Sequence, residues 1–191
     1  MGELEFFLGI KINQSKNGTH HVHQSKYTKE LLKKFNLEDC KIMSTLMHPT
    51  YCMNKEESST KVDQKLYRGM IGSLLYLTSS KLDILFSAGL YAMFQSDPRE
   101  THLTIVKIIF RYLKGTINLG LLYKLSLDYK LVGFCDADYA KDRIERKPNN
   151  GNCQFIGENL IFWARKRNEI IALSTNEAEY ISAAKCCTQL I

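Results

Sequence analysis

The sequence lacks several patterns that would assign a chain to a common class. Its 6 cysteines form no C-x-x-C pair, and its 11 glycines fit neither the G-x-G-x-x-G nor the P-loop pattern. A zinc ribbon, a secreted disulfide framework and the two usual phosphate-binding loops are therefore excluded. Reduced thiols in an intracellular protein are the expectation. The cysteines are Cys40, Cys52, Cys135, Cys153, Cys186 and Cys187.

A long uninterrupted apolar run is also missing. The longest apolar region, "MIGSLLYLTSSKLDILFSAGLYAMF", is broken by Lys81 and Asp83, so it is too interrupted to cross a bilayer. The start, "MGELEFF", has no basic segment followed by an apolar one, and Phe6 stands where a myristoylation signal needs Ser or Thr. No membrane partner and no signal peptide are expected.

The chain does contain enough hydrophobic residues to form a core. It also has a mild excess of basic over acidic residues. Hydrophobic residues make up 45% of the 191 positions, which excludes wholesale disorder and allows one domain or two small ones. The 26 Lys and Arg outnumber the 20 Asp and Glu, giving a formal charge of +6. This charge suits a polyanionic partner without proving one.

The N-terminal part predicts a β-hairpin followed by a helix. The strand-like runs "EFFLGIKIN" and "THHVHQ" flank Asn17-Gly18, a strong two-residue hairpin signal. A helix over 25–36 should follow, with Ser25 as its N-cap. Its apolar stripe is Tyr27, Leu31, Leu32 and Phe35, and its basic stripe on another face is Lys26, Lys29 and Lys33.

The middle of the sequence predicts a loop followed by helices. Residues 38–62 are polar and irregular, Asp63 is placed to cap the next helix, and a second apolar helix covers 83–94. The clearest helix spans 98–114, with Asp97 as the predicted cap and Gly115 as the stop. Its buried positions are Leu103, Val106, Phe110 and Leu113, and its opposite, basic stripe is Lys107, Arg111 and Lys114.

After residue 128 the pattern changes to strands. The runs "YKLVGFCDA", "GNCQFIGE" and "NLIFWARKR" are short, rich in β-forming residues and separated by turns. The segment "STNEAEYISAAKCCTQL" then predicts a helix capped by Ser174 or Thr175. Three strands followed by one helix is the beginning of an α/β domain.

Four carboxylates in this last part could bind divalent metal. Asp136 and Asp138 end the first strand, and Glu177 and Glu179 begin the helix. Anionic oxygens held on rigid elements are the ligands that two-metal phosphodiester hydrolysis requires. The plainer interpretation is that the glutamates favour the positive end of the helix dipole and that Asp138 belongs to a turn. Helical periodicity does not choose between Glu177 and Glu179.

Other polar clusters have a functional and a plain interpretation. His21 and His23 share a strand face, but a half-buried strand explains them better than a metal site. The two basic helix stripes, with a third basic run at 165–167, could contact phosphates, although each alone is typical of a solvated surface. Cys186 and Cys187 lie on the apolar arc of their helix and are most simply core residues.

Six motifs, taken in order, nevertheless carry a resemblance to a known family. They are "FFLGIKI", "HQSKYTKELLKKF", "YRGMIGSLLYLT", "HLTIVKIIFRYLKGT", "GFCDADYA" and "ALSTNEAEY". Together they resemble the polymerase/ribonuclease H junction of a Ty1/copia-type retrotransposon Pol polyprotein, of the plant kind. The resemblance runs almost from end to end.

The resemblance implies an α+β fold in three parts. Residues 1–50 resemble the primer-grip hairpin and first thumb helix of a reverse transcriptase, and 51–128 its helical thumb and connection region. Residues 129–191 resemble the first half of a ribonuclease H-like domain, truncated to three strands and one helix.

The resemblance also implies chemistry. The parent activity is RNA-directed DNA synthesis with hydrolysis of RNA in RNA–DNA hybrids by two Mg²⁺ ions. Asp136 matches the first-strand metal ligand, and Glu179, in "EYISAA", matches the helix glutamate; Asp138 is a lesser candidate. Implied partners are an RNA–DNA hybrid or a primer–template duplex, and the rest of the Pol polyprotein. The implied location is a cytoplasmic virus-like particle or the nucleus.

The match is incomplete. The paired polymerase aspartates should precede Phe6, and two further ribonuclease H carboxylates should follow Ile191. The fragment is therefore expected to be inactive alone, since a metal pair would lack ligands. Alternatives are a non-catalytic nucleic-acid-binding remnant or a functionless pseudogene product whose first strand has an exposed edge. Departures from the family pattern are Leu46 and Leu82 for prolines, Lys141 for glycine, and Pro148-Asn149-Asn150 for "STS".

Overall fold

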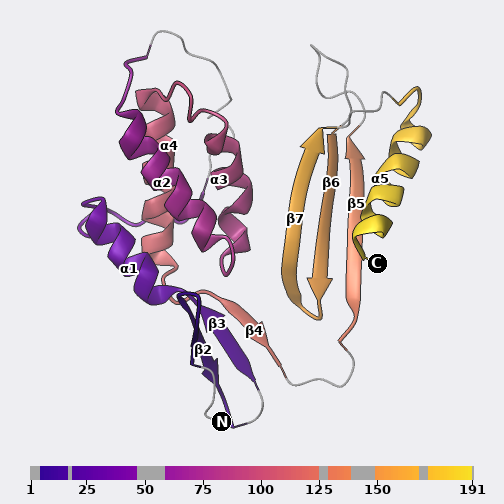
Figure 1. Cartoon of the computed structure of the whole chain (residues 1–191), viewed down its shortest axis with the longest axis horizontal. Helices are drawn as coiled ribbons and strands as arrows, with labels where there is room; N and C mark the ends of the chain where they lie inside the picture. Colours follow the sequence, from indigo (N-terminus) through magenta and orange to yellow (C-terminus); the bar gives the residue numbers. More distant parts are fainter. Residues whose placement is uncertain are drawn as a thin grey trace. The chain divides into compact units, whose positions relative to one another are not determined.

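The computed structural model describes residues 5–16, 19–46, 59–124, 129–138, 149–167 and 172–190. The chain divides into two compact units, Met1–Lys124 and Leu125–Ile191 (Figure 1). The predicted Asn17-Gly18 turn, Lys141 and Pro148 lie outside the described residues. Within the described part, the architecture is mixed, with two antiparallel sheets and five α-helices, which agrees with the α+β prediction.

Unit 1 begins with the predicted hairpin, which is part of a larger sheet. Strand β2 (Ile10–Gln14) pairs antiparallel with β3 (His20–His23), with Ile12 opposite Val22. Two short strands extend the sheet to the order β1-β2-β3-β4: β1 (Phe6–Phe7) and β4 (Leu121–Tyr123). Strand β4 was not predicted, because three residues after a long helix carry too short a pattern to indicate a strand.

The run "EFFLGIKIN" was predicted as one strand, and this was wrong. Leu8 and Gly9 have φ angles of 47° and 76°, so the chain turns between β1 and β2. Two consecutive positive φ angles are what a tight hairpin requires, and glycine adopts them without steric cost. A side chain at position 9 would also lie 2.6 Å from the Tyr76 hydroxyl oxygen. Leu8 is left 73% exposed at the tip.

The helices of unit 1 follow the predicted order. Helix α2 is capped as predicted, because Asp63 Oδ1 accepts a hydrogen bond from the Lys65 backbone N–H at 2.8 Å. The predicted helix over 83–94 is a 3-10 turn, η1 (Leu82–Ile84), leading into α3. The α-helices are α1 (Ser25–Lys34), α2 (Gln64–Leu77), α3 (Leu85–Ala92) and α4 (Glu100–Gly115).

Two predicted caps were wrong. Gln24, and not Ser25, occupies the N-cap position of α1, and its side chain makes no capping hydrogen bond. Helix α4 begins at Glu100 with Arg99 as N-cap, two residues later than the Asp97 prediction. The Asp97 carboxylate instead forms an ion pair with Arg99 at 2.7 Å. It therefore interacts with a residue before the helix and does not occupy the N-cap position.

One core joins the four α-helices described in unit 1. Leu31 and Leu32 of α1 are buried in the same cluster as side chains of α2, α3 and α4. The predicted segments 1–50 and 51–128 therefore share a single core. Leu46, one of the departures from the family pattern, packs against that core. Fully buried members of the cluster are Tyr67, Ile71, Leu74, Leu77, Val106, Ile109, Phe110 and Leu113.

The described residues of unit 2 form three strands and one helix, as predicted. Strands β5 (Leu131–Asp138), β6 (Asn149–Ile156) and β7 (Asn159–Arg167) form an antiparallel sheet in the order β5-β6-β7. Helix α5 (Thr175–Leu190) lies beside β5 (Figure 1). Among the described residues, β5 pairs with β6 alone, so one edge of β5 is open.

Helix α5 packs on one face of this sheet, against β5 and β6. A side chain at Gly133 would lie 2.9 Å from Cys186 Sγ of α5, so this face of β5 touches the helix. On the opposite face Phe134 is 57% exposed and meets Phe155 edge-to-face at 5.8 Å. No helix in the described part of the chain is long and apolar enough to cross a membrane.

Candidate nucleic-acid interface

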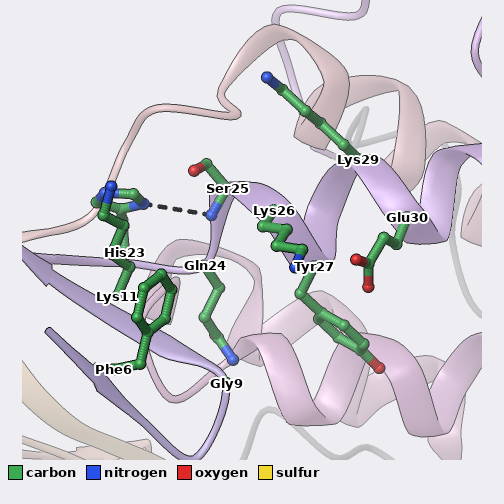
Figure 2. Close-up of a pocket in the computed structure, with 10 residues that line it drawn as sticks. All are labelled: Phe6, Gly9, Lys11, His23, Gln24, Ser25, Lys26, Tyr27, Lys29 and Glu30. Carbon is green, nitrogen blue, oxygen red and sulfur yellow. Dashed lines mark hydrogen bonds between the residues drawn. The ribbon is translucent and has the colours of Figure 1, made fainter.

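A pocket of about 480 Å³ lies in unit 1 where the hairpin meets the start of α1. Residues from β1, β2, β3 and the first turns of α1 line it, as Figure 2 shows. Short strands and the start of a helix meet here because β3 runs into α1 after a single residue, Gln24. The lining residues are Phe6, Gly9, Lys11, His23, Gln24, Ser25, Lys26, Tyr27, Lys29 and Glu30.

The pocket is basic and partly aromatic. Three lysines line it against one carboxylate, that of Glu30. Lys26 and Lys29 were predicted as phosphate contacts, and both are exposed on α1. Lys11 was not predicted, because a lysine between two isoleucines of a strand gives no sign of which element its face meets. Its register position, opposite His23, places it beside the helix start.

Gln24 supplies an unpaired donor at this pocket. The residue is 1% exposed, and its Oε1 accepts hydrogen bonds from Ser80 Oγ at 2.8 Å and Ser79 Oγ at 3.2 Å. Its Nε2 has no hydrogen-bond partner among the described residues. Figure 2 shows the side chain extending from the start of α1, with this amide nitrogen at its end. Sequence reasoning missed Gln24, since a glutamine before a helix is an ordinary polar residue.

His23 is held by protein groups on both ring nitrogens. The Ser25 backbone N–H donates to Nδ1 at 3.3 Å. Nε2 lies 3.0 Å from Asn13 Nδ2. Burial, then the nearby His21 and Lys11, lowers the pKa of His23. Both nitrogens are therefore engaged in structure, which supports the plain interpretation of the His21/His23 pair over a metal site.

The side chains of the two basic helix stripes differ in whether they form hydrogen bonds within the protein. Lys33 of α1 and Lys107 of α4 are exposed. Arg111 instead donates from Nε to the Lys41 carbonyl at 2.7 Å, and Lys114 donates to the Cys40 carbonyl at 2.7 Å. These two side chains fasten the loop after α1 to α4. The side chains of 165–167 lie outside the described residues.

The predicted carboxylates of unit 2 occupy neighbouring elements. Asp136 is exposed on β5, and its backbone carbonyl accepts a hydrogen bond from Ser182 Oγ of α5 at 3.3 Å. Glu179 is exposed one helical turn before Ser182. Because α5 runs antiparallel to β5, Glu179 lies toward the end of the strand that carries Asp136. The side chain of Asp138 lies outside the described residues.

The two carboxylates do not form a complete metal site. Side chains alternate along a strand, so Asp136 faces away from the α5 side that Gly133 marks. Within the described ranges, no three His, Cys, Asp or Glu side chains gather where they could hold a metal ion. The donor chemistry suits Mg²⁺, but the number of convergent ligands does not.

The structure distinguishes Glu177 from Glu179, which periodicity could not do. Glu177 Oε2 accepts the Leu173 backbone N–H at 2.7 Å, and Ser174 Oγ accepts the Glu177 N–H at 3.2 Å. This reciprocal arrangement caps α5 and confirms Ser174 as its capping side chain. Glu177 thus has a structural role, and Glu179 has its carboxylate in solvent.

Comparison with known proteins gives relatives across the whole chain, although no family model and no solved structure matches. The retrovirus-related Pol polyprotein from transposon RE1 of Arabidopsis thaliana is 33% identical over 98% of this chain and 13% of its own length. The one from transposon TNT 1-94 of Nicotiana tabacum is 32% identical over 100% of this chain and 15% of its own length. The chain belongs to the Pol polyprotein family of Ty1/copia-type retrotransposons.

The resemblance of the six motifs to Pol polyproteins of Ty1/copia-type retrotransposons is thereby confirmed. This Pol segment spans only 13% to 15% of the named polyproteins that it matches. An uncharacterized mitochondrial protein of Arabidopsis thaliana matches it more evenly in length, at 31% identity over 100% of this chain and 78% of that protein.

Proposed function

We propose that this Pol segment is the part of a copia-type polyprotein that joins the reverse transcriptase thumb to the ribonuclease H domain. Three features support the proposal. Relatives named as Pol polyproteins match almost the whole chain. A hairpin leads directly into a helix with a basic face, and three antiparallel strands precede a helix that carries a free glutamate.

The role we propose for unit 1 is to contact the backbone of an RNA–DNA hybrid or primer–template duplex. The observation that carries this is the pocket at the start of α1, where Lys11, Lys26 and Lys29 gather beside the unpaired amide of Gln24. The N-terminus of α1, where the N-cap side chain of Gln24 makes no capping hydrogen bond, adds a positive partial charge. Lysines, amide donors and a helix N-terminus are the groups that bind phosphate oxygens.

A binding measurement tests this role. Fluorescence anisotropy with a labelled RNA–DNA hybrid, over a series of salt concentrations, should give affinity that falls as salt rises. The double variant Lys26→Gln/Lys29→Gln should reduce the salt slope by about 1 for each phosphate that a lysine no longer neutralises. The matched control is Lys65→Gln/Lys130→Gln, which removes the same charge from exposed positions elsewhere. An equal reduction in both variants would show a general charge effect and remove the pocket from the proposal.

For unit 2 we propose the ribonuclease H role for Asp136 and Glu179, with the remaining metal ligands supplied from outside the described residues. Hard carboxylate oxygens of this kind hold Mg²⁺ in hybrid hydrolysis. Because no three possible metal ligands gather among the described residues, we expect this segment by itself not to cleave a hybrid. The test is a Mg²⁺-dependent cleavage assay on a labelled hybrid. Turnover that Asp136→Asn abolishes would contradict the expected inactivity.

A further inference from the structure

Strand β5 and helix α5 approach each other unusually closely in unit 2. Ser182 Oγ donates to the Asp136 carbonyl at 3.3 Å, so a short side chain is enough to bridge the two elements. One turn further along, a side chain added at Gly133 would lie 2.9 Å from Cys186 Sγ and 2.8 Å from Leu190 Cδ1. Both observations require the two backbones to lie nearly as close as side chains of this size permit.

Cys135 lies on the face of β5 that meets this helix. It is two residues from Gly133, and residues two apart share a strand face. Its register partner on β6, Asn152, donates from Nδ2 to Gln189 Oε1 of α5 at 2.7 Å, which shows where that face points. Burial raises the pKa of Cys186, and the charge of the nearby Cys135 raises it further.

The two thiols differ in access to solvent. Cys135 is exposed, whereas Cys186, on the side of α5 that meets Gly133 of β5, is 4% exposed. An oxidant therefore reaches Cys135 first, and Cys186 is positioned to react with whatever forms there. A disulfide needs Cα atoms about 4.4–6.8 Å apart, so only elements packed as closely as β5 and α5 are at Gly133 could be joined by one.

We propose that Cys135 and Cys186 form an oxidation site that closes to a disulfide when the protein meets a peroxide. The Cys135 thiolate attacks one peroxide oxygen, the O–O bond breaks, and Cys135 becomes a sulfenic acid while hydroxide leaves. The Cys186 thiol then attacks the Cys135 sulfur, the S–O bond breaks, and water leaves with the thiol proton. Two thiols are oxidised and one peroxide is reduced to the level of water.

The bond would fasten α5 to β5 and so join the helix that carries Glu179 to the strand that carries Asp136. It would close a loop of about 50 residues, which restricts the unfolded chain. Oxidation should therefore raise the melting temperature of unit 2. It should also protect the backbone amides of α5 from hydrogen exchange.

Mass spectrometry of the full chain tests the proposal. After treatment with hydrogen peroxide and alkylation of remaining thiols, a peptide pair linked through Cys135 and Cys186 should be the major oxidised species and should disappear on reduction. The melting transition assigned to unit 2 should rise on oxidation and return on reduction. Cys135→Ser should abolish both effects, and because position 135 is exposed this variant should fold.

The matched control is Cys187→Ser, which removes an exposed thiol one residue along the same helix. This variant should behave as the unmodified chain does. A dominant Cys135–Cys187 bond, a bond between two chains, or over-oxidation of Cys135 without a linked peptide would each overturn the proposal. Cys186→Ala, tested alongside, should leave Cys135 as a sulfenic acid that a dimedone probe captures; failure to capture it would count against Cys135 as the first site.

Discussion

Lys81 donates a hydrogen bond from its ammonium group to the carbonyl oxygen of Thr116, the C-cap of α4, at 2.5 Å. A second bond reaches the Leu119 carbonyl at 3.2 Å. Lys81 is 2% exposed, and burial lowers its pKa. A buried cation at a helix C-terminus satisfies carbonyl groups that the helix itself leaves unpaired. The lysine that interrupts the longest apolar run is therefore a structural part of the core.

Replacing this lysine should destabilise unit 1. Lys81→Met keeps the length of the side chain but leaves two carbonyl groups without their donor, so a decrease of about 1–3 kcal/mol in the free energy of unfolding is expected. Urea denaturation followed by circular dichroism measures it. Lys65→Met, at an exposed position, should change the free energy by less than about 0.5 kcal/mol. Similar decreases in both variants would contradict the capping role of Lys81.

Two histidines should make the stability of unit 1 depend on pH. The Ser25 N–H donates to His23 Nδ1 at 3.3 Å, and the Arg99 N–H donates to His102 Nδ1 at 3.2 Å. Each imidazole thus accepts a hydrogen bond, in its neutral form, from a backbone N–H group at the start of a helix. Burial is the main cause that lowers the pKa of both, with His21 and Lys11 adding for His23 and Arg99 adding for His102.

These lowered pKa values determine whether unit 1 gains or loses stability as the pH falls. Below the unfolded pKa of about 6.5 the unfolded chain binds protons that the folded chain does not bind, so stability is complete above that pH and falls as pH drops toward the folded values. The slope should not exceed about 1.4 kcal/mol per pH unit for each histidine. Urea denaturation between about pH 5.5 and about pH 7.5 measures it. His23→Gln/His102→Gln should flatten the profile, and an unchanged slope in that variant would contradict this assignment.

Glu177 and Glu179 should respond differently to removal of the carboxylate. Glu177→Ala removes the hydrogen bond to the Leu173 N–H at the start of α5, and a cost of about 0.5–2 kcal/mol is typical when a helix cap is removed. Glu179→Ala, at an exposed carboxylate, should cost less than about 0.5 kcal/mol. Thermal denaturation of the full chain compares them. A larger decrease in stability at position 179 would reverse our assignment of the capping residue.

Gly133 should tolerate no side chain. Gly133→Ala places a methyl group within 3 Å of both Leu190 and Cys186, and overpacking of this kind costs about 1–3 kcal/mol. Gly151→Ala in the neighbouring strand meets nothing within 4 Å and should be neutral or slightly stabilising. The difference between the melting temperatures of the two variants measures the cost of adding a side chain where α5 closely approaches β5. Equal effects would show that β5 and α5 can separate at little cost.

Local sequence patterns predicted the elements well and their ends less well. The hairpin, the helices and the three final strands were all expected, because apolar periodicity extends over many residues. The two wrong caps, Ser25 and Asp97, depended on a single side chain each. In the folded chain, Asp97 is held by Arg99, and a histidine from the preceding strand accepts the first N–H of α1.

The candidate site was predicted in part. Lys26 and Lys29 were found because they recur on one helix face, whereas Lys11 and Gln24 reach the same pocket from other elements. Arg111 and Lys114 look equivalent to Lys107 in the sequence. Only the folded loop after α1 shows that their donors are bound to backbone carbonyls.

The sequence by itself determined the order of the elements, because apolar periodicity extends along the chain. Through the resemblance of its six motifs it also indicated the family, and Asp136 and Glu179 are candidate ligands only as that resemblance implies. The tertiary structure alone decided that Glu177 caps α5, that Lys81 is buried at the C-terminus of α4, and that β5 packs against Cys186 of α5. Each of these is an interaction between residues whose partners are chosen by packing and by the need to satisfy buried polar groups, which no local pattern encodes.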